Sequence, residues 1–119
     1  MQRRLLLATL VAGTWLATAP VLAQSQQDFS LVNRTGYQIN ELYVSPSSHT
    51  RWGRDILGDE VMPSGTRRNI TFGRTQRECL YDIRIVYSDG EPAEIREVDL
   101  CRVSVVTLTW NGGTRYSVD

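Results

Sequence analysis

Two cysteines flank the clearest β-hairpin pattern in this 119-residue sequence. Residues 79–87 carry an apolar or aromatic side chain, or a cysteine, at every second position, which is typical of a strand with one buried face. The Asp89-Gly90 dipeptide then predicts a two-residue hairpin turn, and residues 92–100 return as the partner strand. In that register Cys79 lies opposite the residue before Cys101. A single bulge would bring the two sulfur atoms together, so we predict a disulfide between the two cysteines.

Residues 1–23 have the three parts of a secretory signal peptide. Arg3 and Arg4 give a positive start, an apolar run follows, and Ala23 offers a small residue for cleavage. The run is interrupted and short for a membrane span, so an uncleaved anchor is the less favoured alternative, and no later segment is long enough to cross. The arginine pair is also a weak hint of twin-arginine export, but Gln2 stands where Ser or Thr is expected before it, so the general secretory route is favoured over the twin-arginine route. We expect a mature domain of residues 24–119, periplasmic or secreted, where two cysteines normally pair.

Short β-rich runs separated by turn signals fill the mature chain, and no segment keeps a helical period. We therefore predict an all-β domain, an antiparallel β-sandwich of about six to eight strands with an immunoglobulin-like layout. A small barrel is the alternative. Residues 37–45 are partly apolar on both faces and are expected to form a central strand. Residues 45–65 show no clear period, and we expect one helical turn there, capped by Ser48, with Trp52 and Ile56 on one face.

Several segments of the mature chain, taken in order, resemble a family of small exported bacterial β-domain proteins without an established activity. The segments that carry the resemblance are residues 33–37 (NRTGY), 41–46 (ELYVSP), 52–58 (WGRDILG), 79–90 (CLYDIRIVYSDG) and 98–101 (VDLC). Similar domains are attached to larger exported proteins, trypsin-like peptidases among them. The resemblance spans nearly all of the mature chain and implies a recurring β module, but it supplies no catalytic residue.

Side chains that could perform catalysis are scarce. His49 is the only histidine, and the neighbouring Ser47 and Ser48 are too close along the chain for a normal catalytic triad. The motifs Gly-x-Ser-x-Gly and His-Glu-x-x-His are both absent. If the cysteines are paired, no thiol nucleophile remains. The sequence therefore favours a protein that is not an enzyme and needs no cofactor.

One loop holds the side chains with the most potential for binding. Asp55, Asp59 and Glu60 crowd it, and carboxylates on a loop can bind calcium, although their spacing matches no EF-hand. A solvated acidic loop, with Asp55 paired to a nearby arginine, is the simpler interpretation. Trp52 of the same loop could stack on a sugar or a peptide. More often such a tryptophan plugs the end of a sandwich, and we predict that Trp52 is mostly buried.

The charge balance narrows the class of partner. Without the two N-terminal arginines the mature domain has 11 arginines and 13 acidic residues, a net charge of about −2. This balance argues against nucleic acid as the main partner. We expect an exported, non-enzymatic binding or accessory module of the bacterial envelope, with an envelope protein or a glycan as its partner. The alternative function is a calcium-binding or hydrolase-associated domain.

Overall fold

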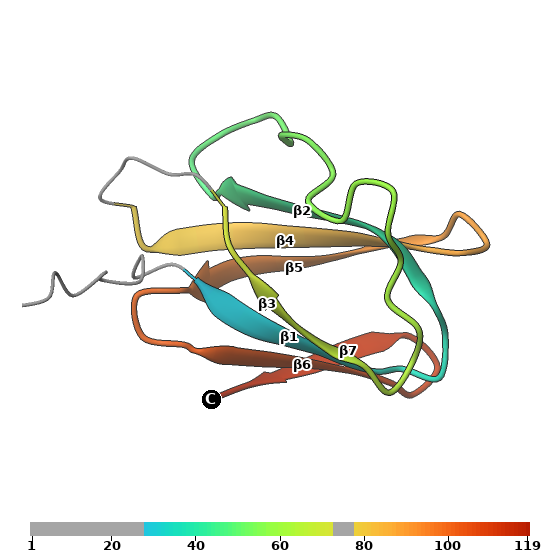
Figure 1. Ribbon diagram of the computed structural model, residues 1–119. Helices are drawn as coiled ribbons and strands as arrows, with labels where there is room; N and C mark the ends of the chain where they lie inside the picture. The colour runs from blue at the N-terminus through green and yellow to red at the C-terminus, as the bar shows by residue number, and fades with distance from the viewer. Residues whose placement is uncertain (1–27, 73–77) are drawn as a thin grey trace, which may run out of the picture.

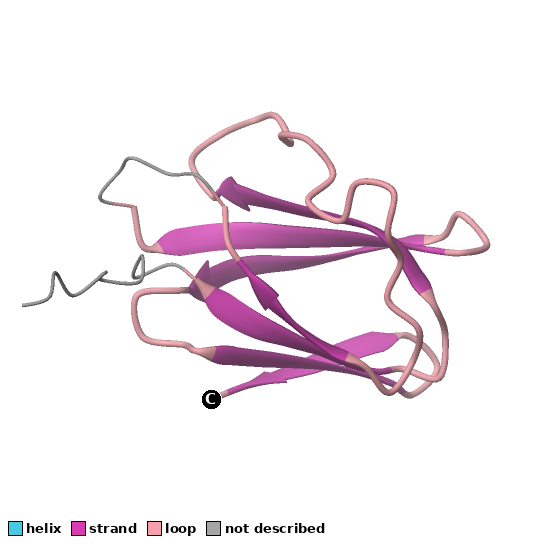
Figure 2. Cartoon of the chain, viewed as in Figure 1, coloured by secondary structure: helices cyan, strands magenta, loops and turns pink. Residues whose placement is uncertain are grey.

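The computed structural model describes residues 28–72 and 78–119, which form seven strands and no helix (Figure 1, Figure 2). The strands are β1 (Phe29–Arg34), β2 (Ile39–Pro46), β3 (Arg67–Ile70), β4 (Leu80–Tyr87), β5 (Pro92–Asp99), β6 (Val105–Trp110) and β7 (Thr114–Val118). The predicted signal peptide, residues 1–23, lies outside the described residues.

The strands form two sheets that pack face to face, so the predicted all-β sandwich is confirmed and the barrel does not form. One sheet has the order β3-β1-β6-β7 and the other the order β2-β4-β5, and Figure 1 shows them as two layers. Four strands facing three is an immunoglobulin-like layout. The strand order is different, because β1 pairs with β3 and β6, whereas the first two strands of an immunoglobulin domain are neighbours. The β1–β6 pair is parallel and the other strand pairs are antiparallel, so the larger sheet is mixed.

The core lies between the sheets and is built from the alternate residues that face inward. Along β4, Tyr81, Ile83, Ile85 and Tyr87 are buried, as the sequence alternation predicts. The buried apolar side chains of the core are Phe29, Leu31, Ile39, Leu42, Leu57, Met62, Ile70, Tyr81, Ile83, Ile85, Tyr87, Ile95, Val98, Leu100, Val106 and Leu108. Both sheets contribute to this one cluster, which holds the two layers together.

The β4–β5 hairpin forms as predicted, but its turn is one residue longer. The Tyr87 N–H donates to the Glu91 carbonyl over 2.9 Å, which leaves residues 88–90 as a three-residue loop. Gly90 closes this loop with a φ of 92°. A left-handed residue at that position is typical of three-residue hairpin loops, and glycine adopts it without a Cβ clash.

A bulge in β5 then shifts the pairing between β4 and β5 by one residue, on the side of the hairpin where the cysteines lie. Between the partners of Tyr81 and Ile83, β5 has one residue more than β4, and Glu97 in this stretch has a φ of 56°. Cys79 and Cys101 form a disulfide with their Cα atoms 5.1 Å apart. The predicted disulfide is therefore confirmed, and the bulge lies inside β5.

The second strand is an edge strand and not the central strand that its apolar faces suggest. A loop borders its outer edge in place of another strand. The Ile56 N–H donates to the Leu42 carbonyl over 2.7 Å, and Met62 forms an isolated bridge with Ile39. The predicted helical turn is wrong, because residues 56–59 form a non-helical turn while the loop follows the edge of β2.

Candidate functional site

Trp52 lies on the outer face of the three-stranded sheet and is only partly buried. Its ring packs against Tyr43 with the centroids 6.5 Å apart, and the Arg96 guanidinium carbon lies 5.9 Å from its centroid. Trp52 does not belong to the core cluster. The prediction that it plugs the sandwich is wrong in position, because the loop carries Trp52 onto the outward side of β2 and β5.

The three acidic residues of that loop do not come together as a ligand set. Asp55 accepts two backbone hydrogen bonds of 2.9 Å through one carboxylate oxygen, and one of them ties the loop to β2. Glu60 forms an ion pair with Arg68, whereas Asp59 is exposed. Among the described residues, the one close group of three potential metal ligands surrounds the disulfide, whose sulfur atoms are bonded to each other.

A carboxylate on the outer face of β4 is buried and accepts three hydrogen bonds. Asp82 accepts hydrogen bonds from the Ser47 hydroxyl (2.7 Å), the Arg96 guanidinium (2.8 Å) and the Glu97 N–H (2.9 Å). Burial raises the pKa of Asp82, but these three bonds outweigh it and hold the pKa below its ordinary value of 3.8. A polar cleft of about 240 Å³ lies beside Asp82 and Trp52. Asp82 and Arg96 of this cleft are bonded to each other, which leaves them less available to a ligand.

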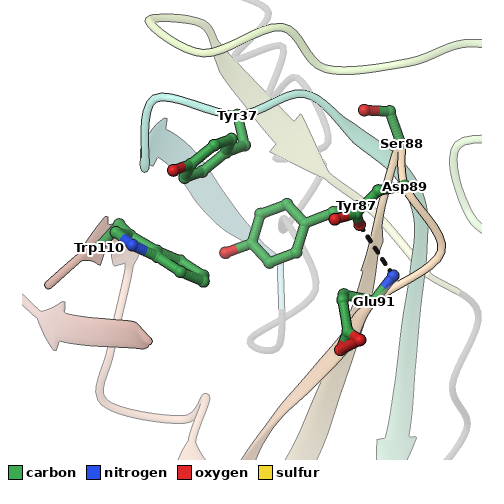
Figure 3. A pocket seen from close by; sticks show the side chains of 6 residues that line it. All are labelled: Tyr37, Tyr87, Ser88, Asp89, Glu91 and Trp110. Atoms are coloured by element: carbon green, nitrogen blue, oxygen red, sulfur yellow. Dashed lines mark hydrogen bonds between the residues drawn. The ribbon is translucent and has the colours of Figure 1, made fainter. Parts of the chain in front are cut away.

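Three aromatic rings meet at the end of the sandwich where the β4–β5 turn lies (Figure 3). Tyr37 follows β1, Tyr87 ends β4 and Trp110 ends β6. Their centroids are 5.1 to 6.1 Å apart, in edge-to-face geometry. Tyr37 is 50% exposed and Trp110 is 43% exposed, whereas Tyr87 is buried. The rings line a cleft of about 220 Å³, which we call the aromatic cleft. Its other lining residues are Ser88, Asp89 and Glu91.

A buried asparagine holds Tyr37 at this position. The Asn33 side-chain amide donates to the Tyr37 carbonyl (2.9 Å) and to the Met62 carbonyl (3.0 Å). Its oxygen accepts from the Thr35 N–H and hydroxyl. Gly36 makes the turn possible with a φ of 89°. The residues 33–37 (NRTGY) are therefore a structural turn that fixes the backbone of Tyr37.

The other two rings are held by strand pairing. Trp110 is paired with Thr114 at the turn between β6 and β7. The Tyr87 hydroxyl forms a 2.6 Å hydrogen bond with the Thr114 hydroxyl, which joins the two sheets beside the rings. Because sheet ends and a buried amide position all three rings, the cleft is preorganised.

Carboxylates border one side of the aromatic cleft. Asp89 accepts a 2.9 Å hydrogen bond from the Glu91 N–H, which shapes the turn, and Figure 3 shows both side chains beside Tyr87. Both residues are exposed, and none of the six lining residues is cationic. The cleft thus combines exposed apolar rings with acceptors for hydroxyl or ammonium groups.

Sequence patterns alone do not predict the aromatic cleft. Tyr37, Tyr87 and Trp110 lie in three strand regions that are far apart in the chain, and only the strand order brings them together. The one signal available in the sequence is that each ring stands at a strand end next to a turn.

Comparisons with protein-family models, with curated proteins and with solved structures find no match to this chain. In the part of the chain that the structure describes, no helix has the length and apolar character needed to span a membrane.

Proposed function

We propose that this chain is an exported, non-enzymatic binding module that holds a glycan of the bacterial envelope in the aromatic cleft. The observation that carries the proposal is the pair of half-exposed rings, Tyr37 and Trp110, at a preorganised cleft. Large aromatic side chains exposed together mark binding sites, because water contact with such a patch is unfavourable. The disulfide is compatible with an oxidising compartment outside the cytoplasm.

The chemistry of the cleft fits a sugar ring. The apolar face of a pyranose can lie on an aromatic ring, and the hydroxyl groups at its edge can donate to carboxylates. Asp89 and Glu91 are the acceptors beside the rings. The polar cleft at Trp52 fits a sugar less well, since Arg96 lies over the ring of Trp52 and is bonded to Asp82.

Binding to envelope glycan tests the proposal directly. The folded, disulfide-bonded domain is sedimented with insoluble peptidoglycan and titrated with its soluble fragments, followed by tryptophan fluorescence. We expect Trp110→Ala and Glu91→Gln to weaken binding, Trp110→Ala by about fivefold or more, since a stacked ring contributes about 1 kcal/mol or more. Trp52→Ala is the matched control, because it removes a tryptophan from a different face.

Three outcomes would reject the proposal. The first is no binding of any fragment at millimolar concentration. The second is loss of binding in Trp52→Ala with retention in Trp110→Ala. The third is binding that needs calcium and survives loss of the ring, which would favour the acidic loop at Asp59 instead.

A further inference from the structure

The last strand leaves two apolar side chains uncovered on the inner side of its sheet. Tyr116 is paired with the buried Leu108, and Val118 is paired with the buried Val106. Paired residues share a face, so Tyr116 and Val118 point to the core side of the sheet. They are nonetheless 47% and 42% exposed. The three-stranded sheet therefore stops short of β7, which is an edge strand of the four-stranded sheet.

The free edge of β7 also presents unpaired backbone groups. Asp119 exchanges backbone hydrogen bonds with Val105 on the β6 side. Backbone direction alternates along a strand, so the N–H and C=O groups of Tyr116 and Val118 point away from β6. Within residues 28–72 and 78–119, no strand pairs with this edge. β7 contains no proline and no bulge, two of the devices that protect edge strands in other proteins.

The outer face of β7 and the residue after it carry one positive and one negative side chain, which would face each other if two copies of the strand paired antiparallel. Arg115 and Asp119 are both exposed, and neither forms an ion pair with a described residue. In an antiparallel pair of two β7 strands centred on Ser117, Arg115 of each copy stands opposite Asp119 of the other. The same register sets Tyr116 opposite Val118, and these are the residues whose backbone groups are free. Opposite charges and aromatic–aliphatic pairs both stabilise antiparallel strands.

We propose that β7 is a self-association edge, at which two copies of this chain pair antiparallel about a two-fold axis at Ser117. The two four-stranded sheets join into one continuous sheet, and Tyr116 and Val118 of both copies form a shared apolar strip. The interface is isologous, so it closes at two copies and leaves no further β7 edge. It is small, so association is expected to be weak and concentration-dependent.

The pairing leaves the aromatic cleft open, because Trp110 lies beside Thr114 at the other end of β7. A dimer therefore presents two clefts. The proposal does not depend on what the cleft binds, since its evidence comes from β7 alone.

A cysteine placed on the two-fold axis tests the register. At Ser117 the two chains form a non-hydrogen-bonded pair with Cα atoms about 4.5 Å apart, within reach of a disulfide. We expect Ser117→Cys to cross-link to a covalent dimer under mild oxidation. Asn111→Cys, exposed at the far end of β7, is the control that reacts with thiol reagents but does not cross-link. Cross-linking of Tyr116→Cys instead of Ser117→Cys would overturn this register.

Charge exchange tests the association itself by sedimentation across a concentration series. Arg115→Glu places like charges together twice and is expected to weaken dimerisation about tenfold or more. The double variant Arg115→Glu with Asp119→Arg restores the opposite-charge pairs and should recover dimerisation. Arg102→Glu, an exposed arginine outside β7, should leave it unchanged. A wild-type chain that stays monomeric at millimolar concentration overturns the proposal, as does a double variant weaker than the single one.

Discussion

The Asp82 carboxylate accepts three hydrogen bonds on the outer face of the three-stranded sheet. It bonds to Ser47 at the start of the long loop, to Arg96 and to the N–H of Glu97 at the bulge. Glu97 is the only described residue other than glycine with a positive φ. A buried carboxylate that accepts a bulge N–H stabilises a backbone conformation that costs free energy in a non-glycine residue. A single side chain thus fixes both the loop and the bulge.

The lowered pKa of Asp82 makes stability depend on pH in a defined direction. The unfolded chain takes up a proton near pH 3.8, before the folded protein does. The Asp82 contribution to stability is therefore present above about pH 4 and is lost as the pH falls below it. We expect Asp82→Asn to lower the free energy of unfolding at pH 7 by about 1–3 kcal/mol, by loss of charge-assisted bonds. The difference from wild type should shrink as the pH falls below about 4.

Urea unfolding from pH 2 to pH 7 measures this effect. Asp59→Asn, which changes an exposed carboxylate of the loop, is the matched control. A constant difference between wild type and Asp82→Asn over the whole pH range would show that the Asp82 charge does not contribute.

At the scale of single elements, the β4–β5 hairpin shows how far the sequence determines the fold. The alternation of residues 79–87 predicted the buried face correctly, because a strand with one apolar side has a period of two. The turn length and the position of the bulge could not be predicted. The bulge at Glu97 depends on the distant Asp82 carboxylate, and the sequence around it carries no glycine to mark a left-handed residue.

The loop after β2 shows where sequence patterns fail. A helical turn with Trp52 and Ile56 on one face was consistent with the spacing, but Ile56 instead bonds to the edge of β2. Trp52 packs on Tyr43, outside the core. The choice between the two arrangements depends on tertiary contacts that no local pattern records. The aromatic cleft escaped prediction for the same reason, because it is made by strand order.

Removal of the disulfide tests how much this bond at the open end of the hairpin contributes to stability. The bond closes a loop with a sequence separation of 22 residues at the open end of β4 and β5. We expect the double variant Cys79→Ser with Cys101→Ser to be destabilised by about 2–5 kcal/mol, since the unfolded chain regains the entropy of an open loop. The variant leaves no free thiol to confuse the measurement. Equal urea midpoints for variant and wild type, both without reductant, would contradict this expectation.

For the molecule as a whole, the predicted mature domain of 96 residues is small enough that its core is modest and a disulfide adds substantially to its stability. Among residues 28–72 and 78–119, sixteen buried apolar side chains form one cluster between the sheets. Total stability of such a domain is on the order of 5–15 kcal/mol. The predicted disulfide contribution of about 2–5 kcal/mol is a large share of that total. The bond is compatible with an oxidising compartment.

Export from the cytoplasm is a prediction about the molecule as a whole. We expect the mature protein to begin at or near Gln24 and to be recovered from the periplasm or the medium, because residues 1–23 have the pattern of a cleaved leader. N-terminal sequencing and mass spectrometry of fractionated cells measure both points. Recovery of the full-length chain with reduced cysteines from the cytosol of the native host would contradict the prediction.

The strand directions also determine where a carrier or a surface can be attached without covering the aromatic cleft. The Ser30 N–H bonds to Ser104, and the Asp119 N–H bonds to Val105, so β1 begins and β7 ends beside the start of β6. Trp110 closes the far end of that strand, about 17 Å away. A carrier protein, dye or sensor surface coupled ahead of Phe29 or after Asp119 is therefore attached at the pole opposite the aromatic cleft. Either coupling leaves the cleft facing the solution, so immobilisation need not mask it.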